Sequence, residues 1–362
     1  MVEWLAGNRI RGTSTERTSA TGFHSAGGGW KFLGRAVAPS SGTSTLSVSG
    51  FDDKRYYMIL GDIKATGGDT VSHIRVNSDG AGNYALRREK DNVQETPSTS
   101  TNRLFSTHNS KTADTRFIQG YISNKSDKEK LGLFNVVENG TDGSTTNDLS
   151  RIDGVGKHAP SSLSVLNEIR LFNDEAGSFA EDSELVVLGW DPADTHTDNF
   201  WTQLDSFNGT NATTMTGNAF TAKKYLWIQG FLKATSGTIT PLLKLGSGGT
   251  VDYTATGYSL KYQFNNLSPV AMNNTTAGLG FFYTTNGSAD GIFFNTFIVN
   301  KSGSDKLCMS HINDGSATPD RTRLTSKWSP TSNPQANIVG VGQWSGSGTF
   351  STDSIIKVWG SD

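Results

Sequence analysis

The chain has 362 residues, more than one hydrophobic core usually serves, so its length predicts two domains. Its 32 Lys and Arg residues against 34 Asp and Glu residues leave a net charge of -2, which excludes a global field that attracts nucleic acid or an anionic membrane. The single cysteine, Cys308, excludes an internal disulfide framework and a cysteine-based zinc cluster. A hydrophobic fraction of 34% with 41 glycines is typical of short strands joined by many turns.

Residues 1–27 form a Gly- and Thr-rich segment without helical periodicity. The sequence has no secretory signal and no stretch of membrane-spanning length, so we expect synthesis in the cytoplasm and no membrane insertion. A mobile tail is one interpretation of the segment. The other, which we favour, is an extended arm that docks on a neighbouring subunit through its apolar and basic residues. These anchor candidates are Trp4, Leu5, Arg9, Arg11 and Arg17.

Apolar runs and period-two alternations, bounded by Gly, Asn, Asp and Ser, predict strands along the rest of the chain. No window sustains a helical period over three turns. The predicted strands include residues 30–37, 130–136, 168–172, 278–283, 291–299 and 337–342. The pattern predicts an all-β fold of antiparallel sandwiches with about eight short strands each.

The stretch "DKRYYMILGDIKATGG" (53–68) recurs as "AKKYLWIQGFLKATSG" (222–237), and three further matches follow in the same order. They pair "HIRVNSDG" with "PLLKLGSGG", "SNKSDKEKL" with "VNKSGSDKL", and "SFAEDSELVVLGWD" with "TFSTDSIIKVWGSD". Colinear matches of this length indicate an internal duplication. We therefore predict a β-sandwich domain at 28–193 and a second at 194–362, joined near the polar segment 191–199.

Within the repeated strand, one face is apolar in both copies and the other is mixed. Tyr57, Ile59 and Ile63 share the first face, as do Leu226, Ile228 and Leu232. We expect this kept face to be the core face. The other face differs between the copies, with Met58 and Asp62 where the second copy has Trp227 and Phe231.

The order of motifs in "YMILGDIKATGGDTVSHIRVNSDGAGNYALRREKD" resembles a concanavalin-like jelly-roll module common in structural proteins of tailed viruses. The closing signatures at 177–189 and 348–360 extend this resemblance to the end of each copy. The resemblance implies tandem lectin-like jelly rolls in a virion component on the capsid exterior or tail. The second copy departs from it, because Gly248 and Gly257 stand where the first copy has Asp79 and Asn83.

The acidic residues offer two further hypotheses. In "AEDSEL", Asp182 and Glu184 lie on one strand face like the paired carboxylates of a glycosidase. Only Asp182 has an acidic counterpart, Asp353, which favours a turn that bonds its own backbone. Asp79 and Asp191 lie in loops that offer oxygen ligands to calcium, but neither loop has the full carboxylate spacing of a calcium site. The six histidines are scattered with no close pair, so we expect no zinc site and no Ser/His/Asp triad. We expect no cofactor, and no metal beyond the calcium hypothesis.

Aromatic side chains of the second copy are candidates for a glycan or partner surface, since aromatic faces stack on sugar rings. The alternative is that they fill the core or a contact between domains. The candidates are Trp227, Phe231, Trp344 and Trp359.

These observations leave three functions open. The first is a non-enzymatic structural protein of the virion surface, held by its arm on capsid or tail subunits in a symmetric assembly of like copies. The second is a lectin-like adhesion protein that binds host-surface glycans. The third is a glycosidase or lyase, for which the duplicated positions do not supply two carboxylates.

Overall fold

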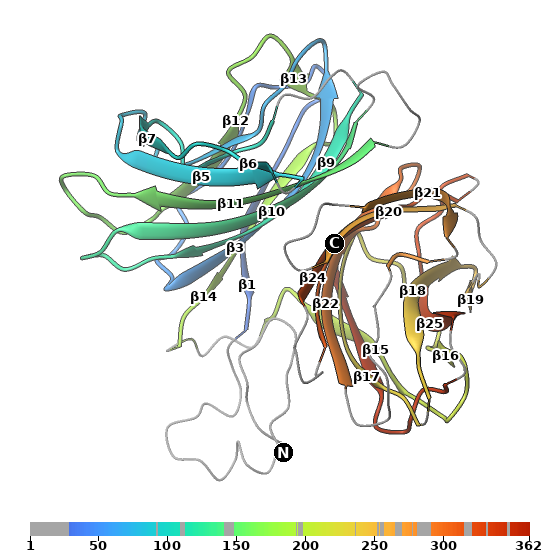
Figure 1. Cartoon of the computed structure of the whole chain (residues 1–362). Coiled ribbons are helices and arrows are strands. Elements are labelled where there is room, and N and C mark those ends of the chain that lie inside the picture. Colours follow the sequence, from blue (N-terminus) through green and yellow to red (C-terminus); the bar gives the residue numbers. More distant parts are fainter. Residues whose placement is uncertain are drawn as a thin grey trace, which may run out of the picture. The chain divides into compact units, whose positions relative to one another are not determined.

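The computed structural model describes residues 29–91, 93–108, 113–140, 148–192, 194, 198–235, 237–251, 253, 257–264, 270–276, 278–280, 291–314, 321–330, 332–345 and 348–362. In these residues the chain is all-β, with antiparallel strands and no helix (Figure 1), which confirms the all-β part of the predicted fold class. It follows that no described helix could span a membrane. The predicted arm, residues 1–27 with its five anchor residues, lies outside the described part of the chain.

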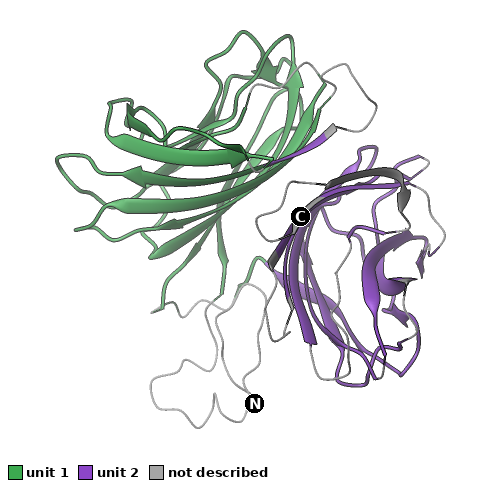
Figure 2. Cartoon of the chain, viewed as in Figure 1, with its two compact units in different colours: residues 1–148, 152–200 green, residues 149–151, 201–362 purple. Residues whose placement is uncertain are grey.

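The chain divides into two compact units (Figure 2). Unit 1 extends to Asp148 and continues from Ile152 to Phe200, and unit 2 comprises Leu149–Arg151 and Trp201–Asp362.

The strands of unit 1 are β1 (Lys31–Val37), β2 (Thr45–Ser49), β3 (Tyr56–Thr66), β4 (His73–Val76), β5 (Tyr84–Lys90), β6 (Val93–Gln94), β7 (Ser98–Thr101), β8 (Phe105–Ser106), β9 (Thr115–Ser123), β10 (Lys130–Gly140), β11 (Asp148–His158), β12 (Glu168–Phe172), β13 (Ser178–Phe179) and β14 (Glu184–Trp190).

The strands of unit 2 are β15 (Thr202–Asn208), β16 (Met215–Thr216), β17 (Tyr225–Lys233), β18 (Thr240–Ser247), β19 (Thr250–Val251), β20 (Tyr258–Phe264), β21 (Val270–Thr276), β22 (Gly291–Val299), β23 (Lys306–Asp314), β24 (Arg321–Trp328), β25 (Ile338–Ser345) and β26 (Ile355–Ser361). Each unit thus has more strands than the eight expected. Residues 278–280, predicted to begin a strand, lie in none.

Each unit has a large sheet and a four-stranded sheet. The large sheets run β1-β14-β3-β9-β10-β11-β5-β6 in unit 1 and β15-β26-β17-β22-β23-β24-β20-β21 in unit 2. The smaller sheets run β2-β12-β4-β8 and β16-β25-β18-β19. In unit 1, β13 also pairs with β3, and β7 also pairs with β5. If the strands on each path are ranked by their order along the chain, strands of equal rank occupy the same place in the two large sheets.

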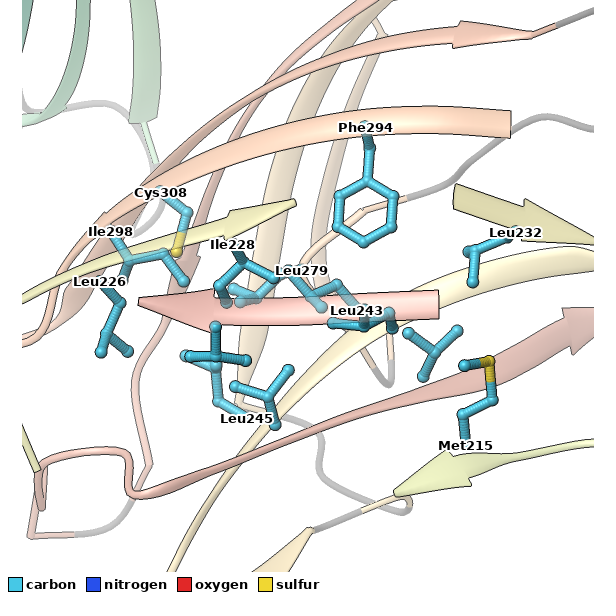
Figure 3. Packing of buried hydrophobic residues seen from close by; sticks show 14 of the residues in the cluster. Met215, Leu226, Ile228, Leu232, Leu243, Leu245, Leu279, Phe294, Ile298 and Cys308 are labelled. Carbon is cyan, nitrogen blue, oxygen red and sulfur yellow. The ribbon is translucent and has the colours of Figure 1, made fainter. Parts of the chain in front are cut away.

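The core of each unit lies between its two sheets, as in a β-sandwich. In unit 1, Tyr57, Ile59 and Ile63 of β3 pack with apolar residues of β4 and β12 from the smaller sheet. The equivalent face of β17 does the same in unit 2 (Figure 3). The labelled residues of Figure 3 are Met215, Leu226, Ile228, Leu232, Leu243, Leu245, Leu279, Phe294, Ile298 and Cys308. The structure confirms the core face that was expected from the repeated strand.

Two serines make the same backbone contacts in the two units. Ser183 Oγ accepts a hydrogen bond from Lys64 N at 3.0 Å and donates to Lys64 O at 3.3 Å. Ser354 Oγ makes the equivalent bonds with Lys233 at 2.9 and 3.1 Å. Each serine therefore ties the start of the last strand to the end of the long repeated strand.

Two tyrosines are also equivalent. The buried Tyr84 hydroxyl donates to Val76 O at 3.0 Å, and the buried Tyr258 hydroxyl donates to Leu245 O at 3.1 Å. Each bond links the large sheet to the smaller one through the core. The repeated tyrosine therefore has the same structural task in both units.

Two repeated glycines permit equivalent close contacts. A Cβ atom at Gly189 would lie 2.5 Å from Leu33 Cδ1, and one at Gly360 would lie 2.6 Å from Leu204 Cδ1. Since Cβ atoms do not approach other carbons so closely, each leucine packs in the space that its glycine leaves.

Candidate functional site

Unit 1 contains a groove of about 950 Å³ on its large sheet. Its lining comes from β3, β5, β7, β9, β10, β11 and β14, together with Trp30 just before β1. Figure 1 shows β5, β11 and β10 following one another across this sheet. Every lining residue belongs to unit 1, so the groove is a property of one unit.

The strand register brings the lining residues together from distant parts of the sequence. Tyr56 of β3 pairs with Trp190 of β14 on one side and with Ser123 of β9 on the other. Ser123 in turn lies opposite Leu131 of β10. Because cross-strand partners share a face, these side chains form one row on the face opposite Tyr57 and Ile59.

Four aromatic rings gather at one end of the groove. Tyr56 stacks on Trp190 with ring centroids 5.3 Å apart, and Trp30 lies 6.0 Å from Tyr121 with its ring tilted by 41°. The Arg55 guanidinium lies 6.0 Å from the centre of the Tyr56 ring, a cation–π distance. Burial raises the pKa of the Tyr121 hydroxyl, which keeps it protonated. This end therefore offers the aromatic faces of Trp30, Tyr56 and Tyr121, with Trp190 buried behind Tyr56.

The rest of the groove is aliphatic and basic. Leu131, Leu133 and Val155 are exposed by 53%, 57% and 49%. Among the lining residues that the structure describes, Arg87 and Lys157 are the charged ones. Arg87 donates to the Gln94 side chain at 2.5 Å, and Lys157 forms an exposed ion pair with Glu129 at 3.2 Å. The groove can hold a ligand that has apolar surface and acceptor or anionic groups.

The four aromatic candidates of unit 2 do not form one exposed platform. Trp227 and Trp359 are buried and lie 6.4 Å apart between ring centroids, and Trp227 also stacks on Phe297 at 4.9 Å. Phe231 and Trp344 are exposed, but Phe231 is on β17 of the large sheet and Trp344 on β25 of the smaller sheet. Trp227 Nε1 donates to the Asn295 side chain, which further fixes its ring.

The calcium candidate Asp79 is bonded within the protein. Its Oδ1 accepts from Ala81 N at 2.9 Å, and its Oδ2 is 2.9 Å from Asn83 Nδ2 and 2.8 Å from His158 Nε2. Burial opposes ionisation, but the bonds from Asn83 and His158 hold the pKa of Asp79 below its ordinary value. Both oxygens already have donors, so Asp79 acts as a support for His158, which stacks on Tyr84 at 4.3 Å.

Unit 2 replaces this network as a whole. Trp328 lies opposite Tyr258, as His158 lies opposite Tyr84, and Gly248 takes the place of Asp79. An indole ring needs no carboxylate support for packing, so Trp328 can pack beside Tyr258 without an acidic residue at position 248.

The second calcium candidate, Asp191, lies at a turn. Its N–H donates to Asp194 Oδ2 at 2.8 Å, and Asp194 pairs with Lys54. Among the residues that the structure describes, no group of three His, Cys, Asp or Glu side chains is placed to hold a metal ion.

The carboxylates of "AEDSEL" are structural in their geometry. Asp182 has a φ of 62°, as a turn residue with a short polar side chain can adopt. Glu184 is buried on β14 and pairs with Arg35 at 3.5 Å. The turn interpretation agrees with these positions.

Sequence reasoning did not find the groove. Tyr56 lies on the same mixed face of its strand as Met58 and Asp62, but nothing in a single strand shows which distant residues join it there. The available signal was a strand whose outward-facing residues are also aromatic or aliphatic. Tyr121, Leu131 and Leu133 show this pattern.

No family model and no curated protein matches the chain. Similar solved structures include the KdgM porin, which is 9% identical and covers 76% of this chain and 99% of its own, with a TM-score of 0.11. The transport unit of the autotransporter AIDA-I from Escherichia coli is 7% identical over 80% of this chain and 90% of its own, with a TM-score of 0.11. A structure described as "Unveiling the Mechanism Behind the in-meso Crystallization of Membrane Proteins" is 7% identical over 77% and 88%, with a TM-score of 0.13. Scores this low carry no argument about fold or function.

Proposed function

We propose that the protein is a non-enzymatic structural protein of a virus particle that attaches to host-surface glycans through the groove of unit 1. The observation that carries the binding role is the gathering of the half-buried Trp30, Tyr56 and Tyr121 in one groove, where the buried Trp190 supports Tyr56 by stacking on it. Aromatic faces pack on the C–H faces of sugar rings, and the nearby hydroxyl and indole groups can bond sugar hydroxyls. Ser98 and Thr99 of β7 also line the groove and add further hydroxyls.

We also propose that the two units are tandem jelly rolls that arose by duplication. The support is the common strand order together with the repeated serine, tyrosine and glycine contacts. A duplicated scaffold lets one copy keep a binding surface while the other diverges. In unit 2, Trp227 packs against Phe297 and Trp359, which is consistent with such divergence.

The groove yields a specific mutational prediction. Trp30→Ala should weaken glycan binding about tenfold or more, because loss of a central aromatic contact commonly costs over 1 kcal/mol. The measurement is a glycan array with the full chain, followed by titration of the best glycan. Trp344→Ala, an exposed tryptophan of unit 2, is the matched control and should bind like the wild type. Equal losses in both variants, or no bound glycan, would contradict the proposed binding role.

Placement in a virion is supported by the sequence resemblance to virion modules and by the composition of residues 1–27. Mass spectrometry of purified particles should find the chain at the copy number of a structural protein. Deletion of residues 1–27 should remove it from particles without unfolding the two units. A glycan-binding chain absent from all particles would instead favour the second candidate, a lectin-like adhesion protein.

A further inference from the structure

The lining of the groove changes in character across the large sheet of unit 1. The strand order β3-β9-β10-β11-β5 places Tyr56 and Tyr121 first, then Leu133 on β10 and Val155 on β11, and Arg87 last. Tyr121 lies directly opposite Leu133, and Val155 lies directly opposite Arg87. Neighbouring strands are about 4.8 Å apart, so this row extends for roughly 19 Å along the sheet. A glycan that contacts the whole row is therefore an oligosaccharide and not a single sugar.

The aliphatic middle of the row suits methyl groups of a ligand. Leu131, Leu133 and Val155 each have about half of their surface exposed. Sugar hydroxyls gain nothing from contact with leucine and valine methyl groups. The methyl group of an N-acetyl or 6-deoxy sugar does gain, because the contact removes apolar surface from water. The middle of the groove therefore favours a sugar that bears a methyl group.

Arg87 gives the far end of the row a positive charge. Its side chain is exposed and donates to the Gln94 side chain at 2.5 Å, so its partner is a neutral amide. A guanidinium has five N–H donors, and most of them are left for a ligand. The nearest acidic residues on the two paired strands, Glu89 and Asp153, lie opposite each other two positions further along and outside the lining. Arg87 can therefore receive an anionic group.

We propose that the groove binds an extended acidic oligosaccharide, with a sugar carboxylate at Arg87 and a methyl-bearing sugar over Leu133 and Val155. This inference rests on the proposed function, because it names the class of glycan that the attachment site takes. Arginine matches a carboxylate in shape as well as charge, since it can donate two parallel N–H bonds. Lys157 has no part in this recognition, because its charge is already matched by Glu129 at 3.2 Å.

Titration of the full chain with two forms of one glycan tests the carboxylate contact. Hyaluronan hexasaccharide carries both carboxylates and N-acetyl groups, and its carboxyl-reduced form keeps only the N-acetyl groups. The wild type should bind the acidic form about tenfold more tightly, as expected for a charge-assisted pair of hydrogen bonds. Arg87→Gln should bind the two forms equally. Lys64→Gln, which removes an exposed charge of β3 outside the lining, is the control and should keep the preference.

A second acidic glycan distinguishes the two sources of a sugar carboxylate. A trimer of α2,8-linked N-acetylneuraminic acid has a carboxylate and an N-acetyl group on every sugar, whereas hyaluronan has them on alternating sugars. Tighter binding of the trimer would assign the carboxylate to a nonulosonic acid, and tighter binding of hyaluronan would assign it to a hexuronic acid. In either case Arg87→Gln should weaken the binding.

The aliphatic contact has its own variant. Leu133→Ala should weaken binding of the acidic and the carboxyl-reduced hexasaccharide by the same factor, about threefold or more, because the methyl contact does not depend on charge. Val37→Ala, at an equally exposed aliphatic position of β1 outside the lining, is the matched control and should bind like the wild type. Hydrogen exchange of the core strand β3 shows whether each variant keeps unit 1 folded.

The outcomes separate this inference from the proposed function. Equal binding of both forms by the wild type, or equal effects of Arg87→Gln and Lys64→Gln, would overturn the carboxylate contact. An unchanged affinity in Leu133→Ala would overturn the methyl contact. Neutral glycans that bind in a Trp30-dependent way, with no binding of either acidic glycan, would reject the inference and leave the attachment role. No bound glycan of any kind would reject both.

Discussion

Replacing Arg116 with alanine should lower the free energy of unfolding of unit 1 by about 3 to 5 kcal/mol, as expected when one partner of a buried ion pair is removed. The Arg116 side chain is only 1% exposed and lies 3.1 Å from Glu138 Oε1, whose side chain is 5% exposed. Its guanidinium also donates to Ser72 Oγ at 2.7 Å, Thr107 Oγ1 at 3.0 Å and Thr70 O at 3.0 Å. Alanine would leave all of these acceptors buried without this donor.

Burial raises the pKa of Glu138, whereas the nearby Arg116 acts to lower it. Without Arg116, the carboxyl group would take up a proton more readily, which limits but does not remove the loss of stability. The measurement is urea unfolding monitored by hydrogen exchange. Exchange in peptides from β3 and β9 reports on unit 1 separately from unit 2.

Unit 2 suggests the matched control for Arg116→Ala. Its strand β22 has the buried Ile292 opposite Leu232, as β9 has Arg116 opposite Ile63. The double variant Arg116→Ile with Glu138→Leu replaces both charges by apolar groups and should lose much less stability than Arg116→Ala. A single variant as stable as the wild type would contradict the buried pair described for unit 1.

Acid should destabilise unit 1 well above the pH at which carboxylates are protonated. The buried His73 has its pKa lowered from 6.5 to about 4, first by burial and then by the adjacent Arg103, and Arg88 acts in the same direction. Asp174, with Oδ1 2.6 Å from His73 Nε2, opposes this shift. Below pH 6.5 the unfolded chain binds a proton that the folded chain does not bind until about pH 4. The free energy of unfolding should therefore fall by up to about 3 kcal/mol over this range.

Urea unfolding at a series of pH values between 7.5 and 4 checks this prediction. His73→Gln keeps a polar side chain without a titrating ring, so its stability should fall less steeply with acid than that of the wild type. His311→Gln, at an exposed position of unit 2, is the control and should follow the wild-type slope. Parallel slopes for His73→Gln and the wild type would show that His73 does not contribute.

Much of the scaffold could be predicted because its signals are local. The alternation in "YYMILGDIK" identifies one face of β3, and the structure places Tyr57, Ile59 and Ile63 of that face in the core. The predicted strands at 168–172 and 291–299 have the bounds of β12 and β22. Strand number was underestimated because two-residue strands such as β6 and β16 have no measurable period.

The surface could not be predicted in the same way, because its chemistry depends on strand order. The Trp227 side chain lies on the face of β17 that points away from the core. It is nevertheless buried, with Trp359 and Phe297 as its cross-strand neighbours. Tyr56 and Tyr121 are equally outward in theirs, yet they line an open groove. Alternation separates the two faces of a strand, but it does not say which outward residues meet or what covers them.

Hydrogen–deuterium exchange of the full chain, with and without the glycan selected on the array, tests the central claim most directly. Binding in the groove should slow exchange in peptides from β5, β7, β10 and β11 of unit 1, and leave β17, β22 and β25 of unit 2 unchanged. Protection confined to unit 2, with none around the groove of unit 1, would contradict the account.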